Sequence, residues 1–241
     1  MKKFLAVVTT TLLASASAQT VVVQPSSSLG LNGLEFGVSA GYASGISGGA
    51  FVHAPNVAGP LGLKLGADFT SPSKNLNDSA AYNTGLDLGT IGDARKNYGL
   101  TDSGSHTTLS LDGTYNLGQV GGGLNMTGYA GGRYGMFSAS ETSGISGATS
   151  TATTKMNSYG VGAGVMLSYP LSRGVSVLGD LGVDQYFGGA LQTTTVNPAS
   201  PNGTDTYTYS TKDADYAAQR ARFAFPGTVL KAKIGVKFNL R

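Results

Sequence analysis

Histidines His53 and His106 are the residues best suited to acid–base chemistry in this 241-residue chain. A histidine base needs a nucleophile to activate and a carboxylate to orient it. Two threonines follow His106, His53 lies near a turn, and the sequence shows no partner for either. The chain has no cysteine, which excludes thiol catalysis and cysteine metal sites. We therefore predict no catalytic residue and interpret His106 as a polar residue at the start of a strand.

Two short patterns resemble ligand sites. The alternating glycines Gly160, Gly162 and Gly164 look like a phosphate-binding loop, but such a loop lies at a strand-to-helix turn and these glycines fall inside a strand pattern. Asp213 and Asp215 offer oxygen ligands for calcium, but two carboxylates do not make a site. We expect solvated loop residues there, with no metal and no cofactor.

The glycines belong to a pattern of period two that recurs along the chain. Residues on opposite faces of a strand alternate in this way. Interior glycines also make these segments poor helices. The pattern predicts eight strands, at residues 33–42, 46–55, 61–69, 105–117, 124–137, 157–169, 175–184 and 229–240.

Connections between these strands alternate in length. The long ones are predicted as loops 71–104, 138–156 and 188–227. The last of them contains TYTYSTK, which suggests a strand protruding beyond the main sheet, and residues 215–225 are a candidate for a further strand. An even number of strands with short turns at one end and long loops at the other is typical of a transmembrane β-barrel.

The two faces of these strands differ in composition. One carries Leu, Val, Ile, Ala and Phe, and the other carries Gly, Ser, Thr, Asn and a few charges. Small residues suit the narrow interior of an eight-stranded barrel, and buried charges must be paired. The predicted ion-pair residues of the lumen are five acids and five bases: Glu35, Lys64, Asp68, Asp112, Arg133, Asp180, Asp184, Lys231, Lys233 and Lys237. The alternative is a secreted soluble β-barrel with its apolar face inward, binding an apolar ligand.

Aromatic residues gather at or near the ends of the segments. Membrane barrels concentrate aromatic side chains at both lipid–water interfaces. The predicted aromatic girdle consists of Tyr42, Phe69, Tyr115, Phe137, Tyr159, Tyr169, Phe187 and Phe238.

From about residue 30 onward, the strand rhythm, the loop asymmetry and the last strand resemble the small OmpA/OmpX-type outer-membrane barrels. The resemblance implies an all-β, antiparallel, up-and-down barrel of eight strands. It also implies that the barrel-assembly machinery recognises the strand from Val229 to Leu240. That family usually ends in an aromatic residue, whereas this chain ends Phe238-Asn239-Leu240-Arg241.

The first residues have the layout of a secretory signal peptide. Lys2 and Lys3 precede an apolar run, and Ala16-Ser17-Ala18 offers a cleavage site, so we expect a signal peptide at 1–18, cleaved near Ala18. A linker at 19–32 and a barrel domain at 33–241 would follow, located in the outer membrane.

The expected role is structural or interactive. The expected partners are outer-membrane lipid, the barrel-assembly machinery and an extracellular or surface-layer ligand of the long loops. The basic residues are too dispersed to suggest nucleic acid. A narrow small-solute channel remains as an alternative, and an enzyme built on the barrel is the least favoured.

Overall fold

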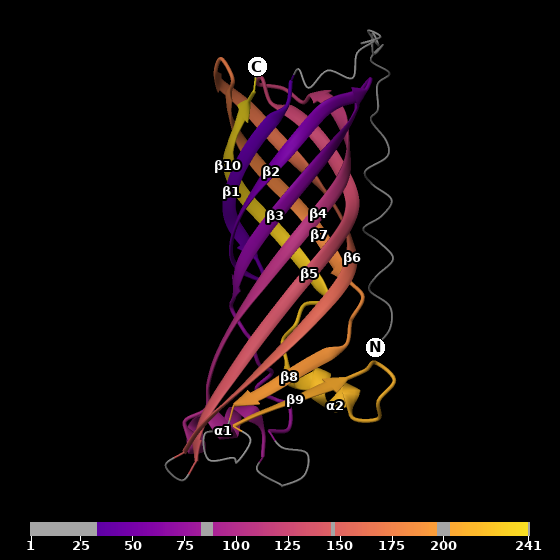
Figure 1. The fold of residues 1–241 in the computed structure, drawn as a ribbon. Coiled ribbons are helices and arrows are strands. Elements are labelled where there is room, and N and C mark those ends of the chain that lie inside the picture. Colours follow the sequence, from indigo (N-terminus) through magenta and orange to yellow (C-terminus); the bar gives the residue numbers. More distant parts are fainter. Residues whose placement is uncertain (1–32, 83–88, 146–147, 197–202, 241) are drawn as a thin grey trace, which may run out of the picture.

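The computed structural model describes residues 33–82, 89–145, 148–196 and 203–240. Strands dominate it, as expected from the alternating pattern (Figure 1). The elements are β1 Glu35–Ala43, β2 Gly45–Ala58, β3 Leu61–Pro72, α1 Ile91–Tyr98, β4 Thr101–Gln119, β5 Asn125–Ile145, β6 Ala148–Ser172, β7 Val175–Tyr186, β8 Leu191–Val196, β9 Thr204–Tyr209, α2 Tyr216–Arg222 and β10 Thr228–Asn239.

Eight of these strands close into a ring. Its order is β1, β2, β3, β4, β5, β6, β7 and β10, every neighbouring pair is antiparallel, and β10 returns to pair with β1. The predicted strand 46–55 is β2 of the ring, and the protruding strand lies at β9, which pairs with β8 outside the ring. The predicted fold class, an antiparallel eight-stranded barrel, is confirmed.

The apolar face of the ring points outward. Leu230 and Ile234 are 70% and 75% exposed, whereas Asp112 and Arg133 are buried inside. Water would not favour a continuous exposed row of this kind, but hydrocarbon does. The soluble alternative required the Leu/Val row to line an interior pocket, and the orientation of the side chains shows that this was wrong.

The two ends of the barrel are unequal. Tight turns at 59–60, 120–124 and 173–174 join strands at what we call the turn end, where β10 also finishes (Figure 1). At the opposite, extended end, β4, β5 and β6 continue far beyond the rim, reaching 19, 21 and 25 residues against 9 for β1.

The prediction that 138–156 forms a loop was wrong. These residues belong to β5 and β6, which pair continuously from the barrel out to Ile145 and Ala148. Their outer face carries Ser and Thr instead of apolar residues because it lies beyond the apolar wall of the barrel. The alternation of polarity that marks the other strands is therefore missing there.

The other two predicted loops also contain regular structure. Residues 71–104 include the end of β3, helix α1 and the start of β4, and residues 188–227 include β8, β9 and α2. The further strand suggested at 215–225 is wrong, because α2 occupies most of it. No helix in the described part of the chain has the length and apolarity to cross a membrane. The predicted signal peptide 1–18 and linker 19–32 lie outside the described residues.

Candidate functional site

Arg133 on β5 stands at the centre of the barrel interior. Its Nη1 donates to Asp112 Oδ1 at 2.5 Å and its Nε donates to Asp184 Oδ1 at 2.7 Å, so one guanidinium links β4, β5 and β7. Two lysines complete the cluster: Lys231 Nζ lies 2.9 Å from Asp184, and Lys64 Nζ lies 3.6 Å from Asp112. Arg133 and both aspartates are at least 97% buried, so the pairing compensates the charges where water does not.

A tyrosine shares this layer. Tyr129 donates its hydroxyl to Asp180 at 2.6 Å, and its ring lies 3.7 Å from Lys64 Nζ. The ammonium over the ring face gains a cation–π attraction in addition to its ion pair. Asp180 therefore takes part in the layer through Tyr129, without a direct ion pair among the described contacts.

The remaining predicted charges pair towards the two ends. Glu35 accepts from Lys237 at 2.8 Å and from His53 Nδ1 at 2.7 Å near the turn end, and His53 Nε2 lies 2.9 Å from Thr114 Oγ1. On the opposite side of the Arg133 layer, by which we mean Arg133, Asp112, Asp184, Lys64, Lys231 and Tyr129, Lys233 lies 2.7 Å from Asp68. The structure thus brings all ten predicted lumen residues to the barrel interior, in contact with a charged or phenolic partner.

The glycine row of β6 makes room for this layer. A Cβ at Gly162 would lie 2.0 Å from Asp184 Oδ1, and one at Gly164 would lie 2.4 Å from the Tyr129 hydroxyl. Real side chains cannot approach so closely. The glycines therefore let the Arg133 and Tyr129 side chains lie flat against the inner wall.

Beyond the charged layer, a hydrophobic core closes the extended end. We call this core, together with segments 73–82, 89–100 and 210–227 that cover the mouth, the cap. Phe137 is its centre: its ring lies 5.0 Å from the rings of His106 and Tyr186 and 6.2 Å from that of Phe225. The other buried members are Ala43, Leu76, Ile91, Ala94, Leu100, Ala139, Met156, Leu191, Phe223 and Val229.

Polar contacts attach the cap segments to the extended strands. Arg222 forms an ion pair with Glu141 of β5 at 2.8 Å, and the backbone of Asn77 donates to Arg222 O at 2.8 Å, so the two cap segments also meet each other. Burial raises the pKa of Glu141, and Arg222 opposes that shift. The cap is therefore a folded unit packed across the mouth.

Arg95 of α1 provides a second attachment. It pairs with Asp102 of β4 and, at 2.8 Å, with Asp78. Burial alone would raise the pKa of Asp102, but the hydrogen bonds from Arg95 and Asn75 hold it below its usual range. The carboxylate is therefore charged and bonded throughout the neutral range.

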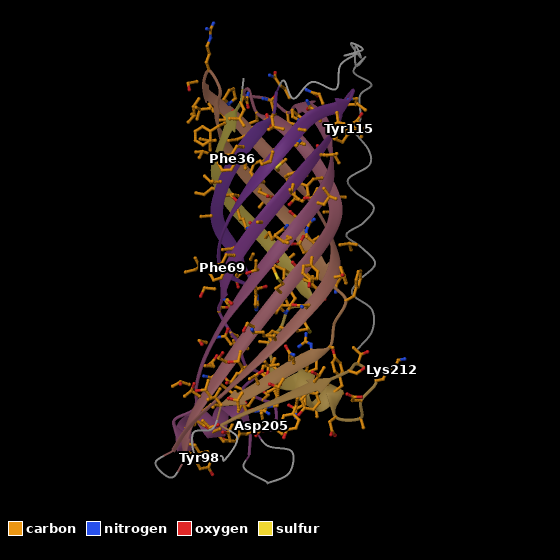
Figure 2. All side chains as sticks on the ribbon, viewed as in Figure 1. Phe36, Phe69, Tyr98, Tyr115, Asp205 and Lys212 are labelled. Atoms are coloured by element: carbon orange, nitrogen blue, oxygen red, sulfur yellow. The ribbon has the colours of Figure 1, made fainter. Side chains whose placement is uncertain are left out.

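Seven of the eight aromatic residues predicted for the girdle lie on the outside of the barrel. Figure 2 shows Tyr115 towards the turn end and Phe69 towards the extended end, on opposite borders of the apolar wall. Phe137 is a correction, because it is 2% exposed and lies inside the cap core. The other exposed members are Tyr42, Tyr159, Tyr169, Phe187 and Phe238.

The two histidines differ in their surroundings: His53 lies between the Glu35 carboxylate and the Thr114 hydroxyl, and all three side chains are buried inside the barrel. His106 contacts the ring of Phe137 and borders an interior cavity of about 20 Å³, which has room for about one water molecule. Asp213 is part of a turn, accepting from the backbone of Ser210 at 2.7 Å. Within the described ranges, no group of three or more His, Asp and Glu side chains could hold a metal ion.

Sequence reasoning missed several interior residues. His53, Tyr129 and Thr114 were not predicted as partners of the charged layer, although Tyr129 shares the inward face of β5 with Arg133 and Thr114 shares that of β4 with Asp112. The rows of glycine in β6 were the available signal, because a missing side chain on an inner face marks where a neighbouring large one lies.

Comparison with solved structures shows what this barrel resembles. The crystal structure of a major outer membrane protein from Thermus thermophilus matches with 28% identity and a TM-score of 0.75, covering 86% of this chain and 98% of that one. The chain is an eight-stranded antiparallel β-barrel of the outer-membrane kind.

Two other barrels match with lower TM-scores. The N-terminal β-barrel domain of Pseudomonas aeruginosa OprF is 16% identical, with a TM-score of 0.38, over 87% of this chain and 98% of that one. Acinetobacter baumannii CarO2 is 14% identical, with a TM-score of 0.41, over 87% of this chain and all of that one. No family model matches the sequence, and neither does any curated protein.

Proposed function

We propose that this outer-membrane barrel is a sealed anchor, without enzymatic activity, that holds its cap at the cell surface for contacts with surface components. One observation carries the proposal. The Arg133 layer crosses the interior, and a hydrophobic core closes the mouth above it. An eight-stranded barrel has an interior just wide enough for side chains. Here two successive layers of side chains occupy it, first the charged residues around Arg133 and then the hydrophobic core.

The orientation follows from the rule that outer-membrane barrels have short turns on the periplasmic side and longer segments outside. The extended end with its cap is then extracellular. Export would use the signal peptide 1–18, removed near Ala18, and the barrel-assembly machinery would recognise β10. Outer-membrane lipid covers the wall, and an extracellular or surface-layer ligand would meet the cap.

Single cysteines test the orientation, because the chain has none of its own. Lys155→Cys lies on the exposed face of extended β6, and Arg173→Cys lies in a turn at the opposite end. A membrane-impermeant maleimide should label the first in intact cells and the second only after the outer membrane is permeabilised. The reverse pattern would overturn the proposed surface role.

Conductance in planar bilayers tests the seal against the narrow-channel alternative. Purified protein that shows the mobility shift of an intact barrel on unboiled gels should give no resolved current steps. Regular steps from the same preparation would establish a channel instead. Because the same gel reports folding, an absence of current cannot result from protein that failed to fold.

A further inference from the structure

The extended end carries a sheet of its own. Beyond the rim, β4, β5, β6, β8 and β9 lie side by side, and the inner face of this sheet packs Ala139, Met156 and Leu191 into the cap core. Its outer face carries mainly hydroxyl side chains. The sheet does not close on itself, so it has two edges: the first residues of β4 on one side and β9 on the other.

The β4 edge is covered. Pairing with β3 stops at His106, but the cap segment takes over from there: Asn75 donates to Asp102 at 3.0 Å, and Arg95 pairs with the same carboxylate. The approach is close enough that a Cβ at Gly104 would lie 2.1 Å from Asn75 Oδ1. Proteins commonly cover edge strands in this way, because a bare edge is a template for pairing.

The β9 edge has no such cover among the described residues. β9 pairs with β8 alone, and every residue from Thr204 to Thr208 is exposed. Its sequence, TDTYTY, contains no proline or lysine, the residues that commonly protect an edge, and only one charge, Asp205. Figure 2 shows Asp205 far from Phe69, so this edge stands well clear of the lipid-facing wall.

We propose that β9 pairs with β9 of a second copy of this chain, joining the two extended sheets into one. This inference rests on the proposed function, which puts the cap at the cell surface. Self-pairing in antiparallel fashion about Thr206 places Thr204 opposite Thr208 and Asp205 opposite Tyr207. The single acid therefore never meets its own copy, so the like-charge repulsion that opposes many self-pairings is absent.

A row of hydroxyls leads directly to this pairing. Ser140, Thr153, Thr194 and Thr206 are register partners on four successive strands. Ser140 and Thr153 lie 2.9 Å apart through their hydroxyl oxygens, and Thr194 and Thr206 lie 3.3 Å apart. In the dimer, Thr206 meets Thr206 and the row continues in reverse order across the copy. Cross-strand Thr–Thr pairs stabilise antiparallel sheets.

The geometry of the pairing also fixes how the two barrels are related. The two-fold axis that joins antiparallel strands into one sheet is perpendicular to that sheet. The extended sheet continues from the barrel wall through β5 and β6 (Figure 1), so this axis runs across the barrel axis and not along it. A half-turn about such an axis makes the second barrel point in the opposite direction. The two copies then sit in facing membranes, so the contact would join one outer membrane to another.

Cysteine cross-linking in proteoliposomes tests the pairing. Under mild oxidation, Thr206→Cys should form a disulfide-linked dimer, whereas Thr204→Cys should cross-link with Thr208→Cys but weakly with itself. Gln192→Cys, exposed on β8 but not at the edge, is the matched control and should remain monomeric. Absence of every β9 cross-link, in protein whose β9 cysteines react with maleimide, would overturn the proposal.

Vesicle clustering tests the arrangement in facing membranes. Proteoliposomes with the wild-type protein should cluster, as measured by light scattering, and Thr206→Lys should abolish clustering because two lysines would meet on the axis. Gln192→Lys adds the same charge one strand away and should leave clustering intact. Cross-linking without clustering would refute the arrangement in facing membranes. Failure of Lys155→Cys to label from outside would instead refute the surface role, whatever the cross-links.

Discussion

Replacement of Arg133 by methionine is the sharpest test of the charged interior. The change keeps an aliphatic chain against the glycines of β6 but removes the guanidinium that links Asp112 to Asp184. Breaking a buried ion pair by removing one partner typically costs about 3–5 kcal/mol. Each aspartate keeps a lysine, Lys64 at 3.6 Å and Lys231 at 2.9 Å, so we expect a cost near the lower figure, about 3 kcal/mol.

Urea unfolding in lipid vesicles would measure this cost. The chain has 12 tyrosines and no tryptophan, so tyrosine fluorescence and the mobility shift on unboiled gels are suitable readouts. Arg173→Met in an exposed turn is the matched control and should change the unfolding free energy by less than about 0.5 kcal/mol. A cost below about 1 kcal/mol for Arg133→Met would refute the reasoning, because a buried pair would then contribute no more than a surface one.

A double-mutant cycle separates the ion pair from general disruption. Asp112→Asn should also destabilise the barrel, and the double variant with Arg133→Met should lose less than the sum of the single changes. Residues in one ion-pair network usually show coupling of about 0.5–3 kcal/mol. Strict additivity would mean that Arg133 and Asp112 stabilise the barrel independently of each other, despite the 2.5 Å contact between them.

Two further predictions concern the cap and the wall. The lowered pKa of Asp102 means that its ion pair with Arg95 stabilises the cap fully above about pH 4, the usual carboxyl range, and that this stability is lost as pH falls through the lowered pKa. Limited proteolysis within 89–100 should therefore increase only in stronger acid, whereas Asp102→Asn should be cleaved there faster already at pH 7; equal cleavage of both proteins at pH 7 would contradict this. Ile234→Lys on the lipid face should cost about 2–4 kcal/mol in vesicles and Thr228→Lys at the rim about 0–1, measured by urea unfolding, and equal costs would contradict the assignment of the wall to lipid.

The barrel could be predicted from the sequence because hydrocarbon favours only apolar residues on the outward face of each strand, whereas the inward face accepts polar ones. Every second residue of β10 from Leu230 to Phe238 is apolar, and the residues between them are lysines and glycine. This contrast gives the strands, their faces and the lumen charges together. Once the face of each strand was known, the charged residues on it were expected inside the barrel, where the structure brings them.

The extended end could not be predicted by the same rule. Beyond the wall, the outer face of β5 and β6 meets water and carries Ser and Thr, so the polarity contrast vanishes although the strands continue. Phe137 shows the reverse problem. It shares the inward face of β5 with Arg133, but at the cap level that face is apolar, so an aromatic residue near a segment end was assigned to the girdle. The backbone phase would have placed it correctly.

The seam between β1 and β10 joins the two ends of the ring, with Glu35 opposite Asn239. Before β10 arrives, β1 and β7 both present rows of unpaired N–H and C=O groups, and each such group costs several kcal/mol in hydrocarbon. A chain that ends before Thr228 therefore forms an open sheet, which is not stable in the bilayer. Insertion into the bilayer and closure of the ring must therefore occur together. Both require β10, the last strand to be synthesised, because it pairs with β7 and with β1.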